Sequence, residues 1–277
     1  MTPTTQDSKD SKDSKNAHKL PRTRFWVTTL AAIVGQIAIV LGILLIGWHH
    51  FENFSIGVAA ATLYLLIPYV AQMPSRLDHI IPAALIVWAI YAWRVPTLAG
   101  FLIGLAGAVS YYPGFLIPLW CGFYWSRGMY RFLIASLGTA AILLSLAIPL
   151  AGGIGPFVSQ LGDIFGFVGV FNRNADSIWT MKSYTVWYRF PVLVLYCMMV
   201  LVLAFWPTVK NLGTLISSVA VLMLGAQFCQ PFQGGLYMAW FLPMLILTVF
   251  RPNLEDRTAR RAVAPVWRKS LLFPVKH

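Results

Sequence analysis

The feature that most constrains this chain is a series of long apolar runs with almost no ionisable side chains. The first run extends from Phe25 to Trp48 and contains none. Hydrophobic residues make up 58% of the sequence and charged residues 11%, with a mean hydropathy of +0.69, whereas about a quarter of the residues in a soluble domain are charged. Continuous runs of this length are typical of membrane helices rather than barrel strands, so the sequence predicts an all-α, polytopic transmembrane helical bundle.

Short charged or helix-breaking turns divide the apolar sequence into about eight predicted spans. They cover residues 25–48, 56–73, 80–93, 98–125, 132–150, 185–206, 212–228 and 236–250. The fourth is broken around residues 110–114 (Ser-Tyr-Tyr-Pro-Gly), and a break at membrane depth usually lines a cavity or is covered by protein. It is interpreted either as one kinked crossing or as a hairpin. Gly100 and Gly104 recur at helical spacing before the break, which predicts a face that packs closely on another helix.

Polar tails flank the apolar region, and the sequence predicts three parts. Residues 1–24, with six Lys or Arg and a repeated Asp-Ser-Lys, form a disordered cytoplasmic tail. Residues 25–250 form the transmembrane domain, with a long external loop at 151–184, and residues 251–277 form a basic cytoplasmic tail. The formal net charge of +12 is explained by the positive-inside rule and by anionic headgroups, and no nucleic-acid partner is predicted.

The distribution of Lys and Arg also predicts the topology. If residues 98–125 make one net crossing, both termini and the turns containing Arg76, Arg127 and Lys210 fall on the cytoplasmic side of the cell (inner) membrane. Glu52 and the 151–184 loop then lie outside. A second crossing within 98–125 would reverse every later loop.

Sequence motifs for cofactor or metal binding are absent. The chain has no phosphate-cradling glycine loop and no nucleophile elbow, and its three cysteines are scattered among apolar runs. His49 and His50 with Glu52 are better explained by an interfacial turn than by a metal site, because adjacent histidines rarely converge on one ion. We therefore predict no metal and no cofactor.

Two polar stretches remain as candidate binding elements. The first is Asp78-His79, which caps a helix N-terminus in the simpler interpretation and lies at a substrate cavity in the functional one. The second is the 151–184 loop with the residue that follows it. It supplies the carboxylates Asp163 and Asp176 and the cations Arg173, Lys182 and Arg189. These cations either hold an anionic lipid phosphate or are merely solvated, with Arg189 extending to the interface.

The middle of the chain resembles a known enzyme family. Residues 94–100 (Arg-Val-Pro-Thr-Leu-Ala-Gly), 104–106 (Gly-Leu-Ala) and 112–116 (Tyr-Pro-Gly-Phe-Leu) are similar to the multi-span C-type glycosyltransferases. The resemblance is closest to the family-87 enzymes that use polyprenyl-phosphate mannose, and it covers roughly residues 56–131 and, weakly, 236–250. Ser110 stands where the family usually has lysine. The chain corresponds to the later part of the family, without its early spans.

The resemblance implies hexosyl transfer from a polyprenyl-phosphate sugar at the external membrane face. A carboxylate would act as general base, with Glu52 as first choice because C-type enzymes generally carry theirs after the first span, and Asp163 and Asp176 as reserves. Arg173, Lys182 and Arg189 would bind the phosphate. The alternative is a non-catalytic multi-span protein that binds lipid or a partner subunit, so the sequence alone leaves open whether the protein is an enzyme.

Overall fold

The predicted all-α fold is confirmed by a computed structural model, which describes residues 22–72, 77–125, 127–165, 189–207, 210–229, 238–254 and 258. Within these ranges every regular element is a helix, and the only β feature is an isolated bridge between Asn211 and Thr258. The elements are α2 (Arg22–His49), α3 (Phe54–Leu66), α4 (Pro68–Gln72), α5 (Leu77–Tyr91), α6 (Pro96–Val109), η1 (Tyr112–Leu116), α7 (Ile117–Phe123), α8 (Met129–Leu150), α9 (Ile154–Phe165), α10 (Arg189–Phe205), α11 (Leu212–Cys229), η5 (Met238–Trp240) and α12 (Leu242–Phe250).

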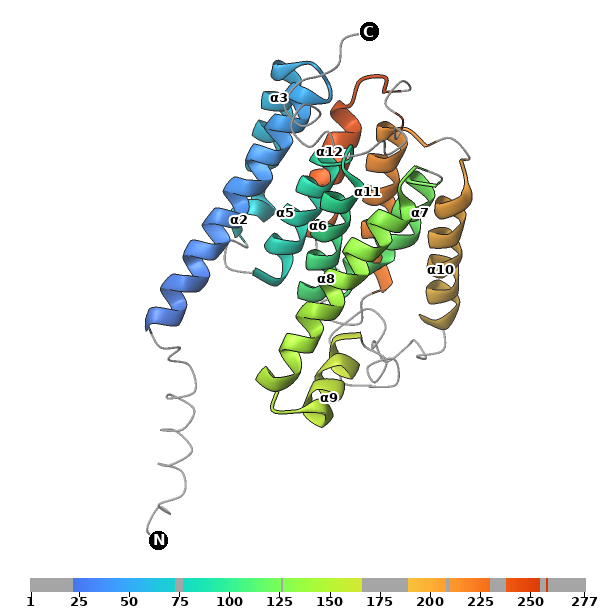
Figure 1. The fold of residues 1–277 in the computed structure, drawn as a ribbon. Helices are drawn as coiled ribbons and strands as arrows, with labels where there is room; N and C mark the ends of the chain where they lie inside the picture. Colours follow the sequence, from blue (N-terminus) through green and yellow to red (C-terminus); the bar gives the residue numbers. More distant parts are fainter. Residues whose placement is uncertain are drawn as a thin grey trace.

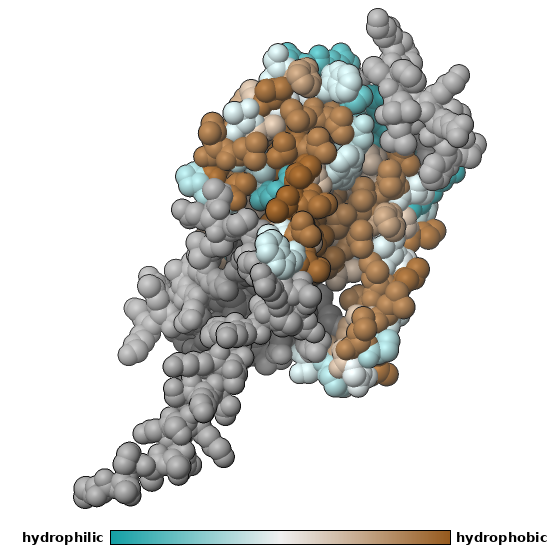
Figure 2. Space-filling model, turned by 90° about the vertical axis from the view of Figure 1, so that its left-hand side faces the viewer, coloured by the Kyte–Doolittle hydropathy of each residue, from teal (hydrophilic) through white to brown (hydrophobic). Residues whose placement is uncertain are grey.

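Three helices are long and apolar enough to cross a membrane, which is fewer than the eight spans predicted. They are Trp26–His49, Met129–Leu150 and Leu212–Cys229, and the apolar helices α3, α5, α6 and α10 are shorter. Large apolar side chains are exposed along α2, α8 and α10. On the face shown in Figure 2, hydrophobic side chains cover most of the described surface and hydrophilic ones gather chiefly toward its upper end. A continuous apolar surface is typical of a protein that contacts lipid.

The first helices fix the direction of the bundle. A Cβ added to Gly35 of α2 would meet Ile80 of α5, and one added to Gly42 would meet Val87, so α2 and α5 run parallel. His50 follows α2, and its Nε2 donates a hydrogen bond to the Tyr91 carbonyl (2.8 Å) at the end of α5. We call this end, at the top of Figure 1, the upper end of the bundle.

The predicted close packing of the glycine face is confirmed. A Cβ on Gly100 would collide with the Phe132 carbonyl of α8, and one on Gly104 would collide with the Ser136 carbonyl. The backbones of α6 and α8 therefore touch, and matching residue order along both helices shows that they run parallel, both leading away from the upper end (Figure 1).

The break in the fourth apolar run is a hairpin. Ser110 is extended (φ −149°, ψ 137°) and ends α6, and η1 and α7 then return toward the upper end. There the Tyr124 hydroxyl donates to the Trp93 carbonyl at 2.5 Å. Residues 96–125 thus enter and leave at the same end of the bundle, which decides between the two interpretations left open by the sequence.

This hairpin changes the relation between the two ends of the described chain. The segment after α12 lies at the upper end, where an added Cβ on Gly213, in the first turn of α11, would meet the Arg251 guanidinium. Helix α2 begins at the opposite, lower end (Figure 1). The prediction that both termini lie on one side assumed a single crossing over 98–125, and it is not supported. The tails themselves, residues 1–21 and most of 255–277, lie outside the described residues.

Candidate functional site

A buried histidine at the start of α5 is the centre of the candidate site. His79 is 3% exposed, and its Nδ1 accepts a hydrogen bond of 2.7 Å from the indole N–H of Trp240 in η5. The two residues are 161 positions apart in the chain, and their rings lie 5.7 Å from one another. This bond joins the first half of the bundle to the short 3-10 helix that precedes α12.

The broken helix supplies the third ring. Tyr112 in η1 is fully buried and stacks on Trp240, with ring centroids 3.6 Å apart and an angle of 17° between the planes. It reaches this position because Ser110 ends α6 and the tight 3-10 turn begins at Tyr112, with Pro113 as its second residue. The break that the sequence shows at 110–114 therefore places an aromatic ring beside the buried histidine.

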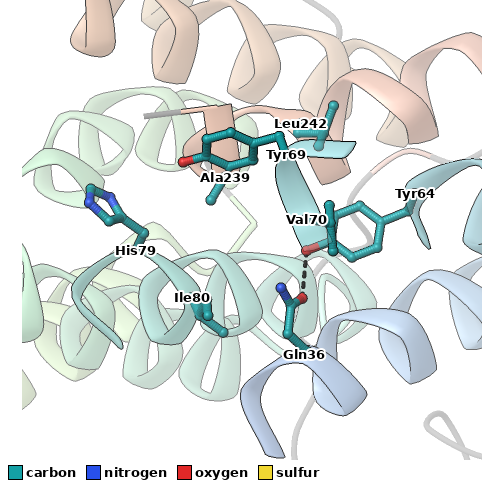
Figure 3. Close-up of a pocket in the computed structure, with 8 residues that line it drawn as sticks. All are labelled: Gln36, Tyr64, Tyr69, Val70, His79, Ile80, Ala239 and Leu242. Atoms are coloured by element: carbon teal, nitrogen blue, oxygen red, sulfur yellow. Dashed lines mark hydrogen bonds between the residues drawn. The ribbon is translucent and has the colours of Figure 1, made fainter. Parts of the chain in front are cut away.

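A small pocket (Figure 3) lies beside the beginning of α5, which is the end of that helix opposite the upper end of the bundle. It is lined by Gln36, Tyr64, Tyr69, Val70, His79, Ile80, Ala239 and Leu242. The Tyr64 hydroxyl donates to Gln36 Oε1 at 2.8 Å, and the hydroxyl end of Tyr69 points toward the side on which His79 lies. Phenol, amide and imidazole groups thus meet in an otherwise apolar environment.

The bond to Trp240 also limits the chemistry of His79. An indole N–H is only a donor, so Nδ1 must be the acceptor and a neutral imidazole carries its proton on Nε2. His79 in this arrangement is a hydrogen-bond donor and cannot take up a proton at Nε2 as a general base. The described lining residues include no carboxylate. The pocket has a volume of about 10 Å³, room for about one water molecule, so in this conformation it can hold a single hydroxyl-sized group.

Of the sequence-predicted site residues, the structure describes Glu52 and the backbone positions of Asp163 and Arg189. Glu52 is exposed in the turn after α2, at the upper end, with a positive φ of 54°. Asp163 is in α9, which follows α8 at the lower end, and its side chain is outside the described part of the structure (Figure 1). A helix of 22 residues such as α8 is about 33 Å long. Glu52 and the described part of the loop, residues 151–165, therefore lie at opposite ends of the bundle.

The predicted cations lie largely outside the described structure. Arg189 is the first residue of α10, at the lower end, but its side chain is not described. Arg173, Lys182 and the carboxylate Asp176 fall in the segment 166–188, which lies outside the described ranges.

Sequence reasoning identified His79 and the broken segment but missed Gln36, Tyr64 and Trp240. A signal for Gln36 exists, because it is an amide within an apolar run of 24 residues, and polar side chains inside such runs are often functional. Trp240 gave no such signal, since tryptophan is an ordinary component of an apolar span.

Comparison with family models, with curated proteins and with solved structures finds no match.

Proposed function

We propose that this protein is an integral membrane protein that binds a lipid-linked sugar phosphate and transfers its hexosyl group, as the resemblance to C-type glycosyltransferases implies. The observation that supports the proposal is the buried cluster of His79, Trp240 and Tyr112 beside the broken helix, together with the small polar pocket that His79 lines. The pocket would receive one hydroxyl group of the ligand, held by the amide, phenol and imidazole groups of its lining. The general base would come from residues outside the described pocket lining.

A second candidate function is non-catalytic binding of the same class of ligand. It is favoured by the pocket lining itself, which contains no carboxylate among its described residues. A general base is required to activate an acceptor hydroxyl. Binding without turnover therefore distinguishes this candidate from the transferase.

The first test is sugar transfer from a radiolabelled polyprenyl-phosphate sugar in membranes with and without the protein. Trp240→Phe removes the N–H that donates to His79. We expect the rate of transfer to fall about tenfold, because one hydrogen bond is lost and the imidazole ring is no longer held in position. Trp88→Phe is the matched control, because it removes an indole N–H bonded to the Ala38 carbonyl (3.0 Å) away from the pocket. Equal loss in both variants would show that Trp240 acts only through stability. Ligand binding without transfer in wild type would support the second candidate.

Glu52→Gln tests where the catalytic centre lies. The substitution keeps the size of the side chain and removes its basicity. We expect transfer to stay within about threefold of wild type, because Glu52 follows α2 at the upper end, whereas His79 of the pocket is near the opposite end of α5. The same assay measures it. A fall of about a hundredfold would return the catalytic centre to the upper end, as the sequence first predicted.

A further inference from the structure

A second cavity lies between α7 and α10, near the upper end of the bundle and away from the His79 pocket. Its volume is about 460 Å³, within the range of roughly 300–1,000 Å³ that small-molecule sites occupy. Pro118 and Cys121 of α7 form one wall, Leu201 and Phe205 of α10 form the other, and Lys210 lies at the edge. All four wall residues are apolar or nearly so.

The cavity lies beside a close backbone contact between the two helices. A Cβ on Gly122 would collide with the Ala204 carbonyl, so the backbones of α7 and α10 are in contact there. The space next to the contact remains open and continues into the exposed apolar surface of α10, where Leu201 and Phe205 are themselves exposed.

Lys210 places a cation at one edge of this apolar space. Its side chain is 7% exposed, and Nζ donates to the carbonyls of Ala204 (2.9 Å) and Pro207 (3.0 Å). These bonds satisfy carbonyl groups at the end of α10, which is a structural role in its own right. An ammonium group has three donors, so one N–H remains for a ligand.

The charge of Lys210 is not balanced by any carboxylate that the structure describes. Burial lowers the pKa of Lys210 from its usual range, and no charged neighbour contributes to the shift. An acceptor with a negative charge would relieve this cost and complete the hydrogen bonding of the amine. The cavity is therefore complementary to an anion at one edge and to hydrocarbon over the rest of its walls.

The surroundings indicate the depth at which the cavity lies. Trp125 and Trp206 are 62% and 69% exposed beside it, and exposed tryptophans are enriched at the level of lipid headgroups. A cation at headgroup level beside an apolar cavity is complementary to one phospholipid molecule, with its headgroup at the cation and an acyl chain in the cavity.

We propose that this cavity binds one anionic phospholipid of the surrounding membrane, with its phosphate beside Lys210 and an acyl chain between α7 and α10. The site is separate from the His79 pocket and does not depend on sugar transfer. The same chemistry could recognise free phosphate, but the apolar walls favour the lipid.

The test is native mass spectrometry of the full-length protein in neutral detergent, titrated with dioleoyl phosphatidylglycerol or dioleoyl phosphatidylcholine. We expect the first phosphatidylglycerol to bind about tenfold more tightly, as one charged hydrogen bond provides. Lys210→Arg should keep this preference and Lys210→Gln should abolish it. Arg131→Gln is the matched control, because Arg131 is another cation toward the upper end but does not line the cavity, and it should keep the preference.

Leu201→Trp fills the cavity while leaving both hydrogen bonds of Lys210 in place, so it tests the site even if Lys210→Gln does not fold. It should eliminate the tight phosphatidylglycerol site. The native thiol gives an independent measurement, since Cys121 lines the cavity. In a Cys197→Ala, Cys229→Ala background, phosphatidylglycerol should slow maleimide labelling of Cys121 at concentrations where phosphatidylcholine has no effect.

Four results would overturn the proposal. They are equal binding of the two lipids to wild type, an unchanged preference in Leu201→Trp, and displacement of the lipid by inorganic phosphate. The fourth concerns Glu255 and Asp256, which lie outside the described residues; Thr258 forms a bridge to Asn211, the chain neighbour of Lys210. If the preference appeared only after both were changed to their amides, the chain's own carboxylates would be the partner of Lys210.

Discussion

Replacing Gly104 with alanine is expected to destabilise the detergent-solubilised protein by about 3 kcal/mol, the upper range for overpacking a tight contact. The added methyl group would collide with the Ser136 backbone, and a main-chain carbonyl cannot move aside without displacing α8. Alanine itself is the better helix former, so the collision has to overcome a favourable change of about 1 kcal/mol. The free energy of unfolding by denaturant, checked by the melting temperature, measures the effect.

Two controls separate the collision from the loss of a glycine. Gly107 is in the same helix, but its added Cβ would have a nearest neighbour at 3.8 Å, and Gly138 of α8 has nothing within 4 Å. Gly107→Ala and Gly138→Ala should leave the protein as stable as wild type or slightly more stable. If Gly104→Ala behaved like these two, α6 and α8 would not be in backbone contact. Leucine at both 100 and 104 is expected to prevent folding.

Cysteine accessibility in intact cells should give an all-or-none result for topology. With Cys121, Cys197 and Cys229 changed to alanine, single cysteines at positions 52 and 253 are expected to react on the same side of the membrane. A cysteine at position 152, after α8, should react only on the other side. All three native residues are exposed, and the first two lie at the upper end whereas Gly152 is at the lower end.

The same experiment distinguishes the hairpin topology from the one that the distribution of Lys and Arg predicted. A single crossing over 98–125 would place position 52 and the 151–184 loop together outside, with the C-terminal segment inside. Labelling of 52 and 152 from one side, with 253 protected, would therefore contradict the hairpin. A permeabilised sample controls for sites that are unreactive for local reasons.

The sequence by itself determined the local structure of this protein. The first apolar run predicted a span over 25–48, and α2 covers Arg22–His49. The spacing of Gly100 and Gly104 predicted a packed face, and the break at 110–114 appears as the η1 turn. These features depend on residues within a few turns of helix, where composition and 3.6-residue periodicity are sufficient.

The direction of the chain after the break was decided only by the tertiary structure. Ser110 and Pro113 end a helix, but they do not fix whether the next one continues or returns. That choice depends on distant contacts, of the Tyr124 hydroxyl with the Trp93 carbonyl and of Tyr112 with Trp240. The charge rule could not substitute for them, because it assigns sides only after the number of crossings is known.

The candidate site depends on distant contacts in the same way. Its polar groups come from four helical segments, and the bond between His79 and Trp240 spans 161 positions. In the sequence, Gln36, Tyr64 and Trp240 are isolated residues in separate apolar runs. In the folded protein Gln36 and Tyr64 line the same pocket as His79, to which Trp240 donates its hydrogen bond. Polar groups removed from water need hydrogen-bond partners, and tertiary packing determines which partners are within reach. Residue pattern determined which segments are helices, and packing alone determined which polar groups meet.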